Sequence, residues 1–508
     1  MFIFAKSNIG QDFRMSFMAL DNNSKFCRTA ELCVLLLLAA ILRLWHIGKA
    51  DIGSDECFSL FYSQFAVPDM ISVLFQGDNP PLWEILLHFW IMLFGVNVLS
   101  IRLLSFVFNL LAVIPIYFIG EKFVKRHTGF FSALFYTFSS FSIFIAHEGR
   151  VYSLLGFLSA CSLYLFLSLI DKKKTSNFIL LTITNVLIMY SHYLAIWLIV
   201  MEFLFFVSVR KFRESLGRAY LWHIAALFVA YLPVLPFLYA RFLDSGLHGT
   251  WIDKCHSISD LYNMICCFTN APVPAVCAIV LLFACLAKII YQIVKRNYSV
   301  DSLTVIFFVW LVPMMVSFAV SFKIGFFYNR YFYFLLPAYM LTLSNSVFYL
   351  FENKRVIKTA LYVAFAFSMV FSMKTDTTQM RYGGWKGEYA KAVNSMVELK
   401  EHNNAVVIFA PEWLEKQIVY YLDENHSLFK NEGNPRQDHV FASYLQKNGY
   451  YYEDDYHEIN VVDNQYVICI NNDFYDISKI KNWLDENGYE ESQIRKYTQM
   501  EVTLFRRR

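Results

Sequence analysis

The chain has 508 residues, of which 57% are hydrophobic and 18% aromatic, and its mean hydropathy is +0.41. This composition is far more apolar than that of a soluble globular protein, so it predicts a polytopic membrane protein. The 44 Lys and Arg against 41 Asp and Glu leave a net charge of only +3, which gives no indication of nucleic acid as a partner. The ten cysteines are scattered and lack metal-ligand spacing, so we interpret them as small buried hydrophobes.

The chain is predicted to begin with a short cytoplasmic segment that leads into the membrane spans. Residues 1–30 are mixed polar and basic without a cleavage-like small-residue site, and we expect them to form this N-terminal segment. Residues 31–374 are predicted to form the transmembrane domain. Its eleven windows long enough to cross a hydrocarbon core of ~30 Å are 31–48, 98–120, 128–146, 151–170, 176–192, 193–209, 219–240, 273–294, 303–322, 331–350 and 356–373.

A further apolar segment, residues 81–95, has the length of an interfacial or re-entrant helix and carries Glu84 and His88. The distribution of basic loop residues decides between spanning and lying on the membrane, because one extra span would reverse every later loop. With an interfacial segment, 19 loop and terminal Lys and Arg lie inside and 6 outside, whereas a spanning segment leaves 9 inside and 16 outside. We therefore expect interfacial helices in one long first outer loop.

Residues 375–508 are rich in charge and are predicted to form a small soluble α/β domain. Helix-like stretches lie at about 385–401, 411–422 and 475–488, and β-like runs at 405–410, 466–470 and 502–505. After eleven spans this domain is expected on the outer face, with the chain as a whole in a bacterial inner (plasma) membrane.

The segment "DIGSDECFSLF" places the adjacent carboxylates Asp55 and Glu56 at the outer end of the first span. An acidic pair at that depth needs a wet cavity or a partner, although an exposed loop acid is the alternative. The segment "FIAHEGRVYSLL" places His147, Glu148 and Arg150, followed by Tyr152, in a short turn on the same face. An arginine there can bind a phosphate through charge-assisted bonds, or it can simply pair with Glu148 to close the loop.

Two later outer turns carry similar residue types. "YSHYLAIW" contains His192 and Tyr193, which are either site residues or aromatic residues of the membrane interface. "FFYNRYFYFLLP" contains Arg330 and Tyr331, and Arg330 is either a second cation for a lipid-linked phosphate or a snorkelling side chain.

These segments, in this order with "GDNPPLWEILLHFWIMLFG", resemble the polytopic glycosyltransferases of the GT-C fold. The resemblance covers roughly residues 30–350 and is greatest to the bacterial branch related to protein O-mannosyltransferases and the lipid A aminoarabinose transferase. It implies transfer of a sugar from a polyprenyl-phosphate-linked donor to an envelope lipid, glycan or protein. The family's His-Pro-Pro is here Asn79-Pro80-Pro81, so the role of the family's histidine does not carry over.

The resemblance assigns Asp55, Glu56 and Glu148 to catalysis, with Asp55 as the general base for attack with inversion. Arg150 and Arg330 are expected to hold the leaving phosphate. The remaining residues expected to bind donor or acceptor are Asn79, Pro80, His147, Tyr152, His192, Tyr193 and Tyr331. No cofactor is expected to be required, with a divalent cation as the open alternative.

Two non-enzymatic functions compete with this interpretation. A transporter or flippase is disfavoured because the acidic residues gather in outer loops and the spans themselves are expected to be nearly free of charge, whereas a carrier needs ionisable groups near the membrane midplane. A membrane-anchored interaction protein displaying residues 375–508 leaves the outer acidic residues without a role.

Overall fold

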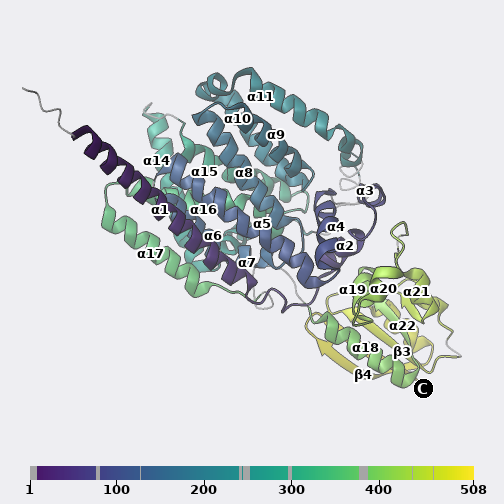
Figure 1. The fold of residues 1–508 in the computed structure, drawn as a ribbon. Helices are drawn as coiled ribbons and strands as arrows, with labels where there is room; N and C mark the ends of the chain where they lie inside the picture. Colours follow the sequence, from purple (N-terminus) through teal and green to yellow (C-terminus); the bar gives the residue numbers. More distant parts are fainter. Residues whose placement is uncertain are drawn as a thin grey trace, which may run out of the picture.

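A computed structural model describes residues 9–75, 80–125, 127–239, 243, 252–295, 300–376, 387–437, 439–460 and 463–508, with side chains from residue 26 onward. Figure 1 shows a large bundle of helices joined to a smaller part built around a sheet. The predicted fold class, a helical membrane protein with a small C-terminal α/β domain, is confirmed.

Helices occupy every predicted window of the bundle. They are α1 (Ile9–Leu44), α5 (Val98–Ile119) with the π-helical turn η1 (Gly120–Val124), α6 (Thr128–Phe138), α7 (Ser140–Ala146), α8 (Tyr152–Asp171), α9 (Thr175–Met189), η2 (Tyr193–Ala195), α10 (Ile196–Ser208), α11 (Arg210–Tyr231), η3 (Leu232–Val234), α13 (Ile258–Phe268), α14 (Pro272–Val294), α15 (Ser302–Ser321), η4 (Asn329–Leu335), α16 (Leu336–Leu350) and α17 (Arg355–Ser372).

The number of spans stays a prediction. Among the described residues, six helices are long and apolar enough to cross a membrane by themselves. One pair, α6 and α7, is bent by 64° and would be a seventh span if the pair crosses as one. The windows at 176–192 and 193–209 form shorter apolar helices, and α13 is a short helix that the sequence analysis did not predict.

The first outer loop contains three short helices, α2 (Ser54–Tyr62), α3 (Val67–Leu74) and α4 (Leu82–Phe94). The helix α4 covers the segment predicted to be interfacial, and its 13 residues are too few to cross the hydrocarbon core. Trp83, Glu84, Leu87 and Ile91 are its buried residues, so one face of α4 packs on the bundle while Phe89, Met92 and Leu93 remain exposed.

The C-terminal part is a five-stranded sheet in the order β2-β1-β3-β5-β4, with β1 parallel to its two neighbours and β5 antiparallel to β3 and β4. Both faces of β1 and β3 are buried, because alternate residues pack against α22 on one side and α18 and α19 on the other. The elements are α18 (Tyr389–Asn403), β1 (Val406–Ala410), η6 (Glu412–Leu414), α19 (Glu415–Tyr421), α20 (Ser427–Asn431), α21 (Ala442–Lys447), β2 (Tyr450–Tyr452), η7 (Tyr456–Glu458), β3 (Tyr466–Asn472), α22 (Ser478–Glu486), β4 (Tyr489–Tyr497) and β5 (Met500–Arg507).

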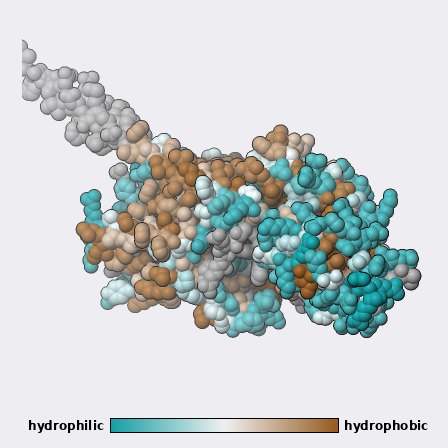
Figure 2. All heavy atoms as spheres, turned by 90° about the horizontal axis from the view of Figure 1, so that it is seen from below, coloured by the Kyte–Doolittle hydropathy of each residue, from teal (hydrophilic) through white to brown (hydrophobic). Residues whose placement is uncertain are grey.

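The surfaces of the two parts differ as a membrane protein requires. Figure 2 shows apolar residues spread over the helical bundle and polar residues over the C-terminal domain. Exposed apolar side chains on α14 and α17 include Val273, Phe283, Val356 and Phe371, each more than 65% exposed. A band of this kind is stable when lipid covers it.

The expectation that the spans are nearly free of charge is wrong. Arg43 on α1 is fully buried, and it donates hydrogen bonds to the Asn109 and Ser142 side chains and to the carbonyl oxygens of Tyr136 and Thr137. Glu202 on α10 is 3% exposed and accepts hydrogen bonds from Ser162 and Asn185. Both side chains join several helices through polar bonds, which is how buried polar groups are satisfied inside a bundle.

Candidate active site

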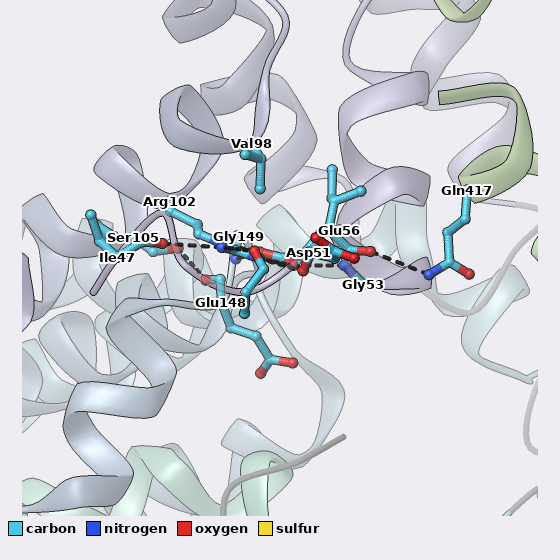
Figure 3. Close-up of polar contacts among 12 residues, drawn as sticks. Ile47, Asp51, Gly53, Glu56, Val98, Arg102, Ser105, Glu148, Gly149 and Gln417 are labelled. Atoms are coloured by element: carbon cyan, nitrogen blue, oxygen red, sulfur yellow. Dashed lines mark hydrogen bonds and ion pairs between the residues drawn. The ribbon is translucent and has the colours of Figure 1, made fainter. Parts of the chain in front are cut away.

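The side chain of Glu56 joins three segments that are far apart in sequence. Its two carboxylate oxygens each accept a hydrogen bond of 2.9 Å from the Arg102 guanidinium, a bidentate pair that is at most 1% exposed. Glu56 also accepts from the amide groups of Gly53, at 2.9 Å, and of Gly149, at 2.8 Å. Figure 3 shows these groups in one line from α5 to the first outer loop. Because its carboxylate is buried and saturated, we interpret Glu56 as a positioning residue and not as a group that touches substrate.

Arg102 completes this anchor. Its remaining N–H groups donate to the carbonyl oxygens of Ile47, Ala50 and Asp51 at distances of 2.7 to 3.0 Å. All five guanidinium donors are therefore used, and they fix the backbone turn that leads from α1 into α2. The sequence analysis did not select Arg102, because an arginine one turn inside an apolar helix resembles a residue of a helix end.

Arg330 bridges the carboxylates of Asp55 and Glu148. One of its terminal nitrogens lies 2.6 Å from the Asp55 carboxylate and the other 2.8 Å from that of Glu148. Side-chain exposure falls from 44% for Asp55 to 13% for Arg330 and 7% for Glu148. Burial acts to lower the pKa of Arg330, but the charges of Asp55 and Glu148 outweigh it and raise that pKa well above its ordinary value. The second carboxylate oxygen of Glu148 is buried and has no hydrogen-bond partner among the described residues.

Arg150 forms a second cationic centre beside Asp55. It donates to the backbone carbonyl of Asp55 at 3.1 Å and to the Ser59 hydroxyl, and it lies 3.6 Å from the Glu84 carboxylate. The Ser59 hydroxyl donates to Glu84 at 2.7 Å. Burial raises the pKa of Glu84, with Arg150 opposing the shift, and its second oxygen has no partner among the described residues.

Glu84 was not among the predicted site residues. The signal for it was the single carboxylate near the start of the apolar helix at 81–95, which the sequence analysis placed in the same outer loop as Asp55. An unpaired carboxylate oxygen on a side chain 2% exposed is costly, so α4 presents Glu84 where a further donor group is needed.

Aromatic rings surround the arginines. The guanidinium of Arg330 lies 5.8 Å from the ring centre of Tyr152 and 5.1 Å from that of Tyr328. The His192 ring lies 6.0 Å from Tyr152 and 5.1 Å from Tyr331. Burial, together with the charge of Arg150, lowers the pKa of His192 to about 4, so the ring is neutral near pH 7. A neutral imidazole and tyrosine hydroxyls beside two arginines suit hydrogen bonding to hydroxyl groups next to a phosphate.

The other predicted site residues lie elsewhere. His147 is 1% exposed and its Nε2 donates to the carbonyl of Arg43 at 2.6 Å, which turns the ring toward the bundle interior. Tyr193 packs with a separate apolar cluster that includes Met189 and Tyr231. Pro80 is buried just before α4, and Asn79 lies outside the described residues.

The C-terminal domain holds the segment directly before Asp55. The amide of Ala390 donates to the Asp51 carboxylate at 2.8 Å, and the amide of Ile52 donates to the Tyr421 hydroxyl at 2.9 Å. Gln417 donates to the carbonyl of Ile52 at 3.2 Å, a bond that Figure 3 shows. Sequence reasoning gave no indication that this domain would contact the candidate site.

Within the parts of the chain that the structure describes, no group of three or more His, Cys, Asp or Glu side chains is arranged to hold a metal ion. The carboxylates of Asp55 and Glu148 both face Arg330, whose single positive charge offsets one of their two negative charges. The absence of a cofactor requirement stays an expectation from the sequence.

Comparisons with known proteins agree with this architecture. Residues 78–239 match the family described as dolichyl-phosphate-mannose-protein mannosyltransferase. That stretch begins just before α4 and includes Glu84, Glu148, Arg150 and His192. A search of curated protein sequences found no match.

Among solved structures, the chain is similar to ArnT from Cupriavidus metallidurans, with a TM-score of 0.61 at 10% identity over 94% of this chain and 98% of that chain. ArnT bound to undecaprenyl phosphate gives a TM-score of 0.60 over the same shares of the two chains, again at 10% identity. The Archaeoglobus fulgidus oligosaccharyltransferase, tethered with an acceptor peptide, gives 0.54 at 11% identity over 87% of this chain and 69% of that chain. The protein therefore has the GT-C fold that these solved structures share, and its residues 78–239 are similar to the mannosyltransferase family.

Proposed function

We propose that the protein is a membrane glycosyltransferase that moves a sugar from a polyprenyl-phosphate-linked donor to an envelope acceptor at the Asp55 site. The observation that carries the proposal is the bridge from Arg330 to both Asp55 and Glu148, with Arg150 beside it. Two arginines and two acidic side chains from three separate segments meet there, in a fold shared with a structure bound to undecaprenyl phosphate.

The chemistry that these groups support is in-line displacement at the anomeric carbon. The acceptor hydroxyl oxygen forms the new bond to that carbon, the bond from carbon to the donor phosphate oxygen breaks, and the phosphate leaves with the electron pair. Asp55 takes the hydroxyl proton, since it is the most exposed of the acidic side chains here and the one an acceptor can reach. In-line attack of this kind inverts the configuration of the anomeric carbon.

The two arginines hold the phosphate before and after the transfer. Both pair with acidic side chains in the structure, so an incoming phosphate would compete with Asp55 for Arg330. This exchange would free the Asp55 carboxylate to act as a base only when a donor is bound. Glu148 and Glu84, each with one buried oxygen lacking a partner among the described residues, would accept hydrogen bonds from sugar hydroxyls.

The experiment is mass spectrometry of envelope lipids, glycans and proteins from a deletion strain, the wild type, and the deletion strain carrying the Asp55→Asn variant. We expect one modification to disappear in the deletion strain and to stay absent with the variant. An unchanged envelope in the deletion strain would contradict the proposal. Restoration by the Asp55→Asn variant at wild-type levels would contradict the assigned base.

A transporter remains the competing class. The buried charges in the helices do not favour it, since Arg43 and Glu202 use their polar atoms in bonds between helices. Purified protein that transfers no sugar from any of a panel of undecaprenyl-phosphate sugars, yet moves one of them across a vesicle membrane, would support the transporter.

A further inference from the structure

A polar cavity lies at the end of the bundle far from the candidate active site. The helix α5 begins near Arg102 and continues through η1 to Val124, about 33 Å away at 1.5 Å per residue. The cavity, of about 280 Å³, is lined there by the basic side chains of Lys125 and Lys211, by Asp301, and by Asn345 among apolar neighbours. The Lys125 ammonium lies 6.0 Å from the ring centre of Phe348, another lining residue, which places this charge at the cavity.

Asn345 on α16 indicates that this cavity takes a polar ligand. Its side chain is 0% exposed, and neither its amide nitrogen nor its oxygen has a hydrogen-bond partner among the described residues. Leaving a buried amide unpaired is costly in free energy, so an occupant that pairs with it is favoured. The free groups of Asn345 are one acceptor and two donors.

An apolar groove of about 470 Å³ lies next to the polar cavity, since Val300 lines both. Its walls are α10, through Met201 and Phe205, and α15, through Phe308 and Val312. On α15 the groove follows one helix face from Thr304 to Val312, about 12 Å at 1.5 Å per residue. The polar cavity and the groove together have the polarity of a lipid, with a charged end and an apolar tail.

We propose that the two cavities together bind one anionic glycerophospholipid, the class of phosphatidylglycerol. Lys125 and Lys211 contact the phosphodiester, the headgroup hydroxyls bond with Asn345 and Asp301, and one acyl chain lies in the groove. One oxygen of Asp301 already accepts from the amide and hydroxyl of Thr304, at 2.9 and 2.6 Å, which caps α15. Two lysines and one carboxylate leave the cavity with one excess positive charge, which matches one phosphodiester.

This site is separate from the proposed transferase site and does not depend on it. The loops around it carry the basic residues that the sequence predicts to face the cytoplasm, where anionic lipids attract such groups. The ligand would come from the opposite leaflet to the proposed sugar donor, so the inference concerns a lipid that holds the bundle together at its inner end.

The test is native mass spectrometry of the purified full-length protein with added phosphatidylglycerol or phosphatidylethanolamine. Three variants report on the parts of the site: the double variant Lys125→Ala with Lys211→Ala removes the phosphate contacts, Asn345→Leu removes the amide, and Val312→Trp fills the groove. Lys354→Ala is the control, since Lys354 is an exposed lysine at the same end that does not line the cavity.

We expect the wild-type protein to retain phosphatidylglycerol in preference to phosphatidylethanolamine. The double lysine variant should bind phosphatidylglycerol about tenfold or more weakly, because it has lost the charge-assisted contacts. The Val312→Trp variant should also lose the lipid, and Lys354→Ala should bind as wild type does. Equal retention of the two lipids, or retention of phosphatidylglycerol by the lysine pair at the wild-type level, would overturn the proposal. The substituted lysines are exposed, so these variants should elute as the wild type does on size-exclusion chromatography.

Discussion

Asp55 and Glu148 share one arginine but differ in exposure, and this difference separates their expected roles. The Asp55→Asn variant keeps size and shape but loses the carboxylate that takes the proton, so transfer should fall by about 10²- to 10⁴-fold. Glu148→Gln should leave more activity, since an amide oxygen can still accept a hydrogen bond from a sugar. Turnover of the purified variants with a validated donor gives both numbers. Equal losses of turnover in the two variants would contradict the assignment of Asp55 as the base and of Glu148 as a residue that orients the sugar.

His192 provides a pH-dependent observable. Its pKa of about 4 in the folded protein lies below the ordinary value of 6.5, so between these values the unfolded chain binds a proton that the folded protein does not. Its contribution to stability is therefore present above pH 6.5 and is lost as the pH falls toward 4, by at most about 1.4 kcal/mol per pH unit. The thermal midpoint should drop between pH 7 and 5 by less in His192→Asn than in the wild type. Parallel drops in both proteins would mean that His192 does not cause the acid sensitivity.

At the scale of elements, the turn between α7 and α8 has no room for a side chain at Gly149. An added Cβ would lie 2.5 Å from the nearest side-chain atom of buried Ile101, next to the amide that bonds Glu56. The Gly149→Ala variant should therefore lose about 1–3 kcal/mol of stability. It should also lose most of its activity, because the added methyl group shifts the turn. Gly48→Ala is the matched control, since an added Cβ there has no neighbour within 4 Å and should change little. Thermal unfolding and turnover of both variants test the prediction, and equal behaviour would contradict it.

The sequence predicts some helices and strands well and others poorly. The long apolar windows could be predicted, and so could the runs at 405–410 and 466–470, which form β1 and most of β3, because all of them are continuous and buried. The strand β4 was missed because it is a sheet edge whose residues are mostly exposed and charged, which makes it look like a loop. The contact of Glu56 with Arg102 was also beyond prediction, since it joins residues 46 apart that meet only when α2 docks on α5. Asp55, Glu148, Arg150 and Arg330 were found because charge at a span end is costly unless it is used.

At the scale of the molecule, the topology is the prediction that the structure leaves to experiment. In a cysteine-free background, single cysteines at Asn97, Lys254 and Arg508 should react with a membrane-impermeant reagent from outside, and those at Lys173 and Lys354 only after the membrane is opened. This follows because the basic loops at the far end from Asp55 face the cytoplasm by the positive-inside rule. Labelling of Lys354 from outside, with Asn97 protected until the membrane is opened, would reject both the interfacial position of α4 and the outer position of the site. Gln76, a further outer position expected from the sequence, lies outside the described residues.

The C-terminal domain holds Ile52 through two hydrogen bonds, and their chemistry affects which residues can stand at that position. On the membrane side the two bonds use only the backbone amide and carbonyl of Ile52, whereas on the domain side they use the side chains of Tyr421 and Gln417. Every residue type except proline offers that same amide and carbonyl, so these two bonds place little demand on the residue at position 52. The side chain at position 52 can thus vary while the attached domain keeps both bonds, whereas Asp51 beside it is needed for its carboxylate, which accepts from the amide of Ala390.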